Sequence, residues 1–527
     1  MARSGKGAVE NYVRHMAFHD AKPDLTRRVS FLWLTRHLRP VLVIALAGLV
    51  FACALALESR FLGLKMEHVR VDETPVTLYR PVDATTLPLV VVAHGFGGSR
   101  QMMDQIAVSL ARQGFLVAAL DLPGHGRNTQ RLSADVADLD GTTAQLVDVV
   151  DHVANTLVKR TDAIGPVSFV GHSMATDIVI RAAQLREDVG GVVAISMYSP
   201  AVTATAPESL LIISGATEKH LRKAGLAAVR QVSEDAREGE TVARDGVTRR
   251  AAVAPFVGHV GVLYAPASLK EITGWLREAK GTDRFASLDD SGWVAGTLLV
   301  GLLLLFWPLS TFMPLKPANA QPLMSKRLFI ICLIAPLPAV LLIAALPTLG
   351  IAGHATFGTL SAIFGVWGLV QLFLLRRGGI RVEAPDLPGM LVYLGCALVF
   401  ALALDRYGAA FLPTDMRAVV MFGLLIGTLP MMLADTLLVE NAPLLRRLLV
   451  RLSFLVALSS AMALAPKELG LAFTTLPVMV LFFVVYGSMA RWIAARRGAT
   501  GVAIGKAIFL AWSIAASTPL FAVTGLS

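Results

Sequence analysis

One serine in this chain stands in a setting that favours nucleophilic chemistry. Ser173 lies at the centre of the segment GHSMA (171–175), which follows an apolar run typical of a buried strand and precedes residues with helical spacing. A sharp strand-to-helix turn lifts a serine hydroxyl clear of a sheet, and only very small residues fit two positions before and after it. We therefore predict a nucleophile at Ser173. Ala175 stands where glycine is usual and is expected to crowd the turn slightly.

The elements that must position this serine belong to a chain too apolar to be wholly soluble. Of its 527 residues, 55% are hydrophobic and 16% are charged, and the mean hydropathy is +0.62. Residues 60–290 have the mixed composition of a globular domain, whereas residues 293–527 contain one long apolar segment after another. The net charge of +10 comes from Lys and Arg residues that cluster beside apolar segments, which favours a membrane role over nucleic-acid binding. All three cysteines lie in apolar segments, so no disulfide framework is indicated.

The first 57 residues predict a membrane anchor. Residues 1–39 form a basic leader with eight Lys and Arg residues against three acidic ones, and residues 40–57 are an uninterrupted apolar run of 18 residues, just long enough to span a bilayer. This leader is much longer than the basic region of a signal peptide, so an uncleaved signal anchor is favoured over a cleaved one. The leader should lie in the cytoplasm and the chain after Glu58 on the other side of the membrane.

Between the anchor and residue 290, short strands alternate with helical segments. Residues 66–80 predict an antiparallel hairpin, and residues 89–93 are a fully apolar run of the kind that a central parallel strand needs. Further strands are predicted at 115–120, 167–170, 192–195 and 210–213, and helices at 102–111, about 140–160, 174–186 and 268–276. This alternation predicts an α/β domain with a mostly parallel sheet and helices on both faces.

The region from about 66 to 280 resembles the α/β-hydrolase fold, the superfamily of serine hydrolases that includes esterases, lipases and lysophospholipases. Besides GHSMA, three motifs carry the resemblance in the expected order. The segment HGFGG (94–98) resembles the oxyanion-hole loop of the superfamily, and DLPGHG (121–126) resembles its aspartate-x-x-glycine-histidine-glycine turn. The segment SGATE (214–218) lies where the acid follows a late strand. Only the 14 residues 196–209 lie where related enzymes often insert a lid, so no large lid is expected.

The resemblance implies a catalytic triad in the chain order serine, acid, histidine. A serine hydroxyl needs a neighbouring base to accept its proton, and His259, in a glycine-flanked loop before the closing helix, is expected to be that base. An ordinary surface histidine is the alternative. Glu218 occupies the position of the acid, which orients the imidazole. Glu234 and Asp235 compete with Glu218, because the interval from Glu218 to His259 is longer than usual.

The resemblance also implies an oxyanion hole. The tetrahedral intermediate of acyl transfer carries a negative oxygen, which aimed backbone N–H groups stabilise. These groups are expected to come from Phe96 and from Met174, the residue after the nucleophile. His94, Asp121 and His125 are interpreted as structural residues that hydrogen-bond the loops beneath the site.

The region 293–527 predicts an all-α membrane domain of about eight helices. The spans lie at roughly 293–314, 328–348, 356–375, 387–404, 418–438, 448–465, 469–490 and 502–523. If residues 60–290 lie outside, the inside loops and their edges contain twelve Lys and Arg residues, whereas the outside loops contain three, Arg406, Arg417 and Lys467. This asymmetry predicts a cytoplasmic amino terminus and an extracytoplasmic hydrolase domain.

Five polar residues in or near the predicted spans bear on the role of this domain. Asp435, Glu440, Lys506 and His354 are candidates for a polar path, but most of them lie near predicted span ends, where snorkelling or interfacial placement is the simpler interpretation. Gln371 is expected to form a hydrogen bond between helices. A bundle that holds or feeds the hydrolase is therefore favoured over a transporter.

Together these features predict a membrane-anchored serine hydrolase that cleaves carboxylic esters through an acyl-enzyme on Ser173. We expect lipid or acylated substrates, reached on the periplasmic side of a bacterial inner membrane. The arrangement of one span, a lipase-like domain and several spans is similar to that of the inositol deacylases of glycolipid anchors. An acyltransferase with the same triad, or a transporter or scaffold with a non-catalytic hydrolase-like domain, is the alternative. The sequence contains no metal, phosphate-loop or dinucleotide motif, so no cofactor is expected.

Overall fold

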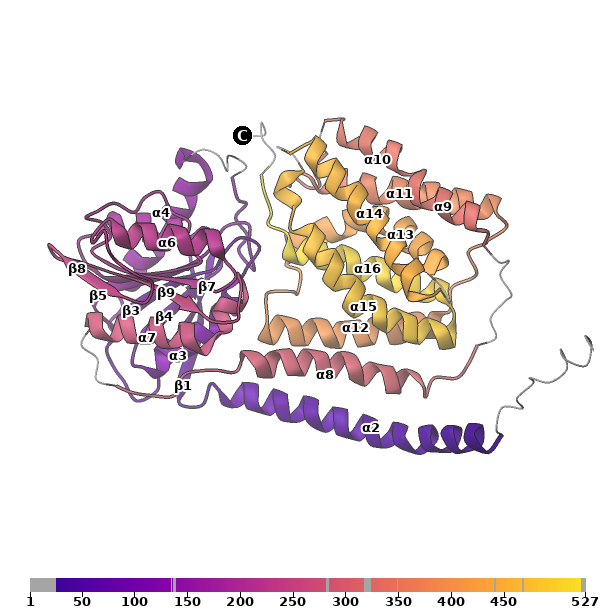
Figure 1. The fold of residues 1–527 in the computed structure, drawn as a ribbon, viewed down its shortest axis with the longest axis horizontal. Coiled ribbons are helices and arrows are strands. Elements are labelled where there is room, and N and C mark those ends of the chain that lie inside the picture. The colour runs from indigo at the N-terminus through magenta and orange to yellow at the C-terminus, as the bar shows by residue number, and fades with distance from the viewer. Residues whose placement is uncertain are drawn as a thin grey trace, which may run out of the picture.

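Two bodies, an α/β domain and a bundle of helices, lie side by side in the molecule (Figure 1). The computed structural model describes residues 25–133, 135, 139–280, 284–316, 324–347, 349–439, 442–466 and 469–522. Helix α2 (Leu25–Ser59) runs along the bundle to the α/β domain. Most of the leader predicted at 1–39 lies outside the described residues. The helix begins at Leu25, so it contains the end of that leader as well as the whole predicted span at 40–57.

The α/β domain is built on one sheet of nine strands in the order β1-β2-β4-β3-β5-β6-β7-β9-β8. Neighbouring strands from β4 to β9 run parallel, whereas the pairs β1–β2, β2–β4 and β8–β9 are antiparallel. The strands are β1 (Leu64–Val71), β2 (Thr74–Pro81), β3 (Leu87–Ala93), β4 (Leu116–Leu120), β5 (Ala163–His172), β6 (Val189–Ile195), β7 (Ser209–Gly215), β8 (Thr241–Arg244) and β9 (Val247–Ala254). Every predicted strand is present, and the predicted α/β-hydrolase architecture is confirmed.

Helices cover both faces of this sheet (Figure 1). Helices α3 (Asp104–Arg112) and α7 (Pro266–Lys280) lie on one face. Helices α4 (Ala144–Leu157), α5 (Met174–Gln184) and α6 (Lys219–Arg230) lie on the other. The continuous apolar run of β3 follows from this arrangement, because Leu89 and Val91 pack into one core while Val90 and Val92 pack into the opposite one.

The hairpin of β8 and β9 was not predicted from the sequence. Its two-residue turn is Asp245-Gly246, with φ values of +49° and +82°. An Asp-Gly pair between strands favours this type of turn, so a sequence signal for the hairpin was present. Helix α6 and this hairpin occupy the long interval between Glu218 and His259.

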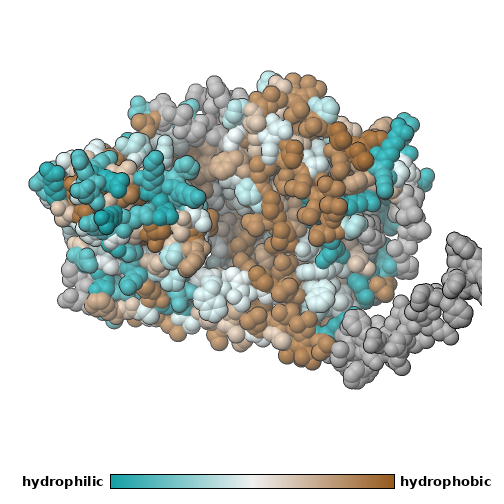
Figure 2. All heavy atoms as spheres, viewed as in Figure 1, coloured by the Kyte–Doolittle hydropathy of each residue, from teal (hydrophilic) through white to brown (hydrophobic). Residues whose placement is uncertain are grey.

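The helical bundle makes the chain a multi-pass membrane protein. Within the described residues, nine helical segments, including residues 38–59 of α2, are long and apolar enough to cross a membrane, which agrees with the predicted number. Their apolar side chains form a broad outer surface beside the polar surface of the α/β domain (Figure 2). The other helices are α8 (Gly292–Ser310), α9 (Lys326–Ile334) with α10 (Leu337–Ala344) as one span, α11 (Phe357–Arg377), α12 (Leu387–Tyr407), α13 (Asp415–Val439), α14 (Leu444–Leu464), α15 (Thr475–Arg497) and α16 (Ala499–Ser517).

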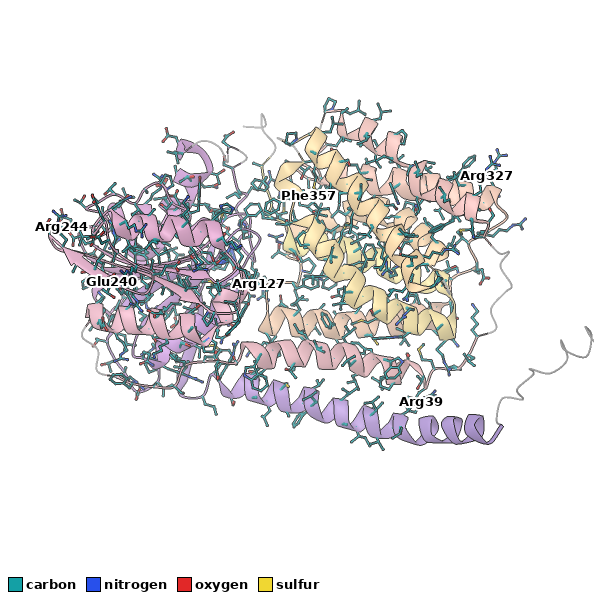
Figure 3. All side chains as sticks on the ribbon, in the orientation of Figure 1. Arg39, Arg127, Glu240, Arg244, Arg327 and Phe357 are labelled. Carbon is teal, nitrogen blue, oxygen red and sulfur yellow. The ribbon has the colours of Figure 1, made fainter. Side chains whose placement is uncertain are left out.

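The α/β domain and the bundle are joined by specific hydrogen bonds. The Arg417 side chain on α13 is 2% exposed, and it donates to the carbonyl oxygens of Gly124 and Gly126 at 2.8 and 3.1 Å. After α16, the chain pairs with Leu132 of the α/β domain through Leu520 and Ala522. Arg127 also lies at this junction, whereas Arg39 and Arg327 lie at the opposite end of the bundle (Figure 3).

The interpretation of Asp435 and Lys506 as interfacial residues is wrong. Both side chains are buried and form an ion pair between α13 and α16. The pair is inside because α16 is the most buried of the nine spans, and opposite charges there neutralise each other. Arg451 on α14 lies 3.6 Å from the same carboxylate. Glu440 and Lys467 lie outside the described residues.

Gln371 and His354 both contact distant segments of the chain. The Nε2 atom of Gln371 donates to the carbonyl oxygen of Cys332 at 2.9 Å, so the expected hydrogen bond between helices is present. His354 was assigned to a span end, and it lies in the connection between α10 and α11. There it is 1% exposed and forms a bridge with Ala522 near the α/β domain.

Candidate active site

Ser173 occupies the turn between β5 and α5. Its φ of +53° and ψ of −118° are unfavourable for a residue other than glycine, as expected for a strained nucleophile turn. The Ser173 N–H donates to the carbonyl oxygen of Ile195 at 2.8 Å, which ties the turn to the end of β6. A Cβ atom at Gly171 would lie 2.7 Å from a methyl group of Val179, so a residue with a side chain does not fit at this position. The methyl group of Ala175 is accommodated in the core beneath the turn.

The three residues predicted for the triad lie in one hydrogen-bonded line. The Ser173 Oγ atom lies 2.8 Å from His259 Nε2, and His259 Nδ1 lies 2.6 Å from Glu218 Oε1. Glu218 follows β7 and His259 follows β9, so the carboxyl ends of neighbouring parallel strands bring them together. Glu234 and Asp235, the competing acids, are exposed beyond the end of α6.

Glu218 is held in place by more than the histidine. Its Oε2 atom accepts hydrogen bonds from the Gly215 N–H at 2.6 Å and from the Ser196 hydroxyl at 2.8 Å. Burial favours a higher pKa for this carboxyl group, but the hydrogen bonds from His259, Gly215 and Ser196 outweigh burial and hold its pKa below the usual value. Glu218 is therefore arranged as an ionised acceptor for the imidazole.

Sequence reasoning missed two residues that support this line. Ser196, which directly follows β6, anchors Glu218 from the carboxyl edge of the sheet, but a serine after an apolar strand is too common a pattern to have identified it. His172 lies beside the nucleophile, and its Nε2 atom donates to the carbonyl oxygen of His259 at 2.9 Å. Burial lowers the pKa of His172 to about 4, so its ring is neutral near pH 7. No sequence pattern indicated that His172 would hold the loop of His259.

The loop after β3 packs directly on the nucleophile turn. A Cβ atom at Gly95 would lie 3.0 Å from the Ser173 Cβ atom and 2.8 Å from the His172 ring, so only glycine allows this approach. Phe96 is the next residue in the loop. Met174 is the first residue of α5, and the N–H groups of a first helical turn have no acceptor within their helix. The backbone N–H groups of both residues are thus close to the nucleophile, and their role in an oxyanion hole stays a prediction.

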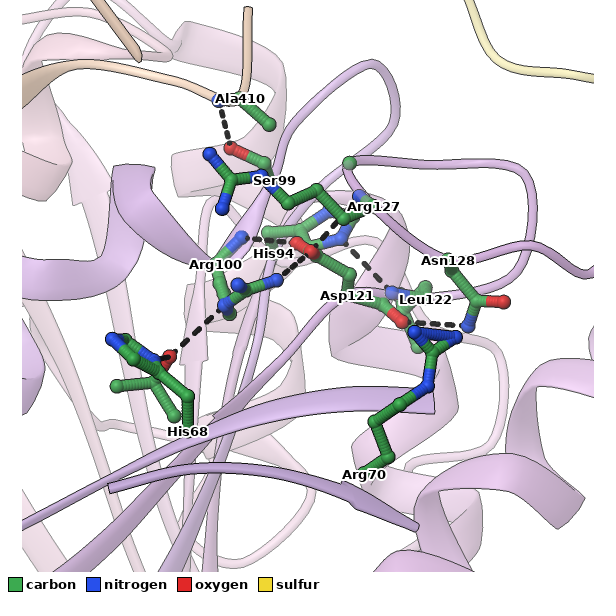
Figure 4. A network of polar contacts seen from close by, with 12 residues as sticks. His68, Arg70, His94, Ser99, Arg100, Asp121, Leu122, Arg127, Asn128 and Ala410 are labelled. Carbon is green, nitrogen blue, oxygen red and sulfur yellow. Dashed lines mark hydrogen bonds and ion pairs between the residues drawn. The ribbon is translucent and has the colours of Figure 1, made fainter. Parts of the chain in front are cut away.

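A buried polar network supports this loop from below (Figure 4). Asp121 pairs with the Arg100 guanidinium and also accepts from the Arg100 N–H at 2.8 Å. The His94 Nε2 atom accepts from the Leu122 N–H at 3.1 Å, and its Nδ1 atom lies 2.8 Å from the Gly95 carbonyl oxygen. Burial lowers the pKa of His94 and of His125. These contacts agree with the structural role expected for His94 and Asp121, and the His125 Nδ1 atom lies 2.8 Å from the Pro123 carbonyl oxygen of its own turn.

A cavity of about 530 Å³ opens in front of Ser173. Most of its lining is apolar, and Leu132, Leu146, Met174 and Ile178 contribute to it. One wall comes from the connection between α14 and α15, where Phe473 stacks on Phe96 with 5.3 Å between ring centroids. The membrane domain therefore lies over one side of the site.

The chain is similar to known proteins over the region of its α/β domain. A family model described as "Serine aminopeptidase, S33" matches residues 85–260. No curated protein matches the chain. Among solved structures, the dienelactone hydrolase of Anabaena variabilis is 19% identical, with 42% of this chain and 97% of that chain covered and a TM-score of 0.31. A bacterial membrane phospholipase A is 15% identical, with coverage of 49% and 99% and a TM-score of 0.30. A Pyrobaculum calidifontis esterase is 15% identical, with coverage of 47% and 98% and a TM-score of 0.32.

Proposed function

We propose that this chain, a serine hydrolase whose α/β-hydrolase domain is joined to a multi-span membrane domain, cleaves carboxylic esters that carry an apolar acyl group. The observation that carries this proposal is the apolar cavity of about 530 Å³ at Ser173. An apolar acyl chain gains free energy when it leaves water for such a lining. Because Phe473 of the membrane domain closes one wall, we place the source of the substrate in the membrane. A membrane lipid or another acylated molecule fits this position.

The geometry supports an acyl-enzyme mechanism. His259 Nε2 accepts the proton of the Ser173 hydroxyl as the oxygen attacks the ester carbonyl, and the Glu218 carboxylate stabilises the resulting imidazolium. The backbone N–H groups of Phe96 and Met174 stabilise the tetrahedral oxyanion. His259 then gives its proton to the leaving alkoxide, which leaves the acyl group on Ser173. Water attacks this ester with His259 as base, and the carboxylic acid is released.

Exposure of the base favours hydrolysis over acyl transfer. The His259 side chain is 48% exposed, whereas the Glu218 side chain behind it is 7% exposed. Water can therefore reach the imidazole and be activated there. An acyltransferase would have to exclude water from this position while its acceptor alcohol binds.

We propose that the hydrolase domain lies on the periplasmic side of a bacterial inner membrane, with the amino terminus in the cytoplasm. The distribution of basic residues supports this orientation, because twelve Lys and Arg residues lie in or beside the loops assigned to the cytoplasm. The end of the bundle that carries Arg39 and Arg327 is the end away from the hydrolase domain (Figure 3).

The test is labelling of the full-length chain in detergent with a fluorophosphonate, which reacts with an activated serine. We expect the native chain to be labelled, and the Ser173→Ala and His259→Ala variants to lose labelling. Glu218→Gln should keep the fold but lower ester turnover at least tenfold, because an amide no longer stabilises the imidazolium. Absence of labelling in the native chain would overturn the enzyme mechanism. Unchanged turnover of Glu218→Gln would instead move the acid to Glu234 or Asp235.

A further inference from the structure

A second cavity lies at the opposite end of the bundle from Ser173. It has a volume of about 320 Å³ and is enclosed by the ends of helices α13, α14, α15 and α16. Apolar residues such as Val439, Ala490 and Val502 form part of its lining. Six of its described lining residues are cationic and none is acidic, namely Lys316, Arg447, Arg451, Arg491, Arg496 and Lys506.

Four of these cations already have partners. Lys506 and Arg451 both approach the Asp435 carboxylate, which is buried behind the cavity. Lys316 lies 3.6 Å from Asp386, and Arg496 donates to backbone carbonyl oxygens, among them that of Met313 at 2.8 Å. These contacts hold the wall of the cavity in place, so the cavity is a built feature of the bundle.

Arg447 and Arg491 are different, because neither side chain forms a hydrogen bond or ion pair with another residue that the structure describes. The Arg447 Nε atom is buried without a hydrogen-bond partner. Arg447, Arg451 and Arg491 carry like charges and line the same cavity. Arg447 and Arg451 are four residues apart on α14, where like charges destabilise a helix. The positive charge of these two side chains favours the binding of an anion in the cavity.

The orientation of the spans in the membrane does not by itself explain why these basic residues surround one cavity. Basic residues gather at the cytoplasmic ends of spans, but they normally extend their charges into water. Arg376 at the end of α11 does so and is exposed. Arg447 is half-buried, and together with the exposed Arg491 it lines a single cavity, into which the amino-terminal ends of α14 and α16 also contribute positive partial charge.

We propose that this cavity binds a phosphate group, held by Arg447 and Arg491. Guanidinium groups match phosphate oxygens with paired, charge-assisted hydrogen bonds. A cavity between membrane helices near their ends, with both cationic and apolar lining, fits the headgroup of an anionic phospholipid. A free phosphate ion shares the same chemistry and is the other possible source.

The test is thermal melting of the delipidated full-length chain in detergent, with added short-chain phosphatidylglycerol, phosphatidylcholine of the same chain length, or inorganic phosphate. We expect phosphatidylglycerol to raise the melting temperature at concentrations about tenfold or more below those needed with phosphatidylcholine. The double variant Arg447→Gln/Arg491→Gln should need about tenfold or more phosphatidylglycerol than the native chain, because a hydrogen bond to a charged group is typically worth that factor or more. Arg376→Gln is the matched control and should behave as the native chain does.

The outcomes separate the two sources and test the site itself. Stabilisation by phosphatidylglycerol without an effect of inorganic phosphate assigns the site to a lipid headgroup, whereas equal stabilisation by inorganic phosphate assigns it to a free anion. Without ligand, the double variant should melt at or above the native temperature, since a repulsion has been removed. The proposal is overturned if the double variant responds to both anions as the native chain does. A lower melting temperature of the ligand-free variant would also overturn it, because the arginines would then be structural.

Discussion

At the residue scale, the candidate site depends on side chains that do not themselves touch a substrate. Ser196 and the Gly215 N–H fix one oxygen of Glu218, so the other oxygen is aimed at His259. His172 holds the backbone of His259 from the opposite side. The base is thus positioned through both its ring and its main chain. Fixing a catalytic ring in this way reduces the entropy lost on reaching the reactive geometry.

The buried His172 predicts a specific dependence of stability on pH. Its folded pKa of about 4 lies below the ordinary value of roughly 6.5, so the unfolded chain binds a proton first as pH falls. Its contribution to stability is therefore complete above about pH 6.5 and is lost as pH falls toward 4. At pH 5 the loss amounts to about 2 kcal/mol. Glutamine cannot titrate, but its amide can still donate to the carbonyl oxygen of His259.

The measurement is the melting temperature of the full chain at pH 7 and pH 5. Between these values we expect the native chain to lose more stability than His172→Gln, by an amount on the order of 4 °C. Groups such as His94, His125 and Glu218 are present in both chains and serve as the internal control. Equal losses in the two chains would show that protonation of His172 does not limit stability in acid.

At the element scale, the membrane domain supplies parts of the hydrolase site rather than an anchor alone. The connection between α14 and α15 places Phe473 against Phe96, and α13 places Arg417 beneath the turn at 121–126. The same guanidinium donates to the carbonyl oxygens of Ala515 and Thr518 at the end of α16. Arg417 thereby ties two membrane helices to the turn at 121–126, which contacts the loop predicted to form the oxyanion hole.

Replacing Arg417 by methionine should weaken the attachment of α13 and α16 to the turn at 121–126. The substitution keeps apolar length but leaves four buried carbonyl oxygens without this donor, and a hydrogen bond from a charged group typically contributes about 1.5–3 kcal/mol. We expect a lower melting temperature and a lower rate of ester hydrolysis. Arg406→Met is the matched control, because Arg406 pairs with Glu58 and both side chains are about half exposed, where such a pair is worth about 0–1 kcal/mol. An equal effect of the two substitutions would contradict the role given to Arg417.

At the scale of the whole molecule, the arrangement has two chemically different ends. The hydrolase site and its apolar cavity lie at one end of the bundle, and the cationic cavity of α13 to α16 lies at the other. Between them the outer surface of the bundle is apolar (Figure 2). A bilayer around this surface would separate the two sites into different compartments.

Orientation can be measured with one exposed arginine on each side. We expect Arg244→Cys, on β8 of the hydrolase domain, to react with a membrane-impermeant maleimide in intact spheroplasts. Arg327→Cys, at the start of α9, should react only after the membrane is permeabilised. The native chain is the control, since Cys53 and Cys332 are buried and Cys396 lies within a span. Labelling of Arg327→Cys alone in intact spheroplasts would reverse the orientation.

Much of the fold was encoded in local patterns of the sequence. The apolar run at 89–93, the small residues around Ser173 and the long apolar segments each depend on neighbours in the chain, because steric demands and periodicity act over a few residues. The order of the motifs then indicated which residues would meet. The hairpin of β8 and β9 had a local signal as well, in the Asp245-Gly246 pair.

The tertiary structure alone decided the contacts between distant segments. No local pattern distinguishes Ser196 from another serine after a strand, or shows that His172 would support His259. Phe473 meets Phe96, and Arg447 and Arg491 share a cavity, only because whole helices pack at particular angles. Such angles depend on the fit of complete surfaces rather than on neighbouring residues. Local patterns in the sequence therefore predicted Ser173 as the nucleophile and the elements around it, whereas packing decided what contacts Ser173, what covers it and what the far end of the bundle encloses.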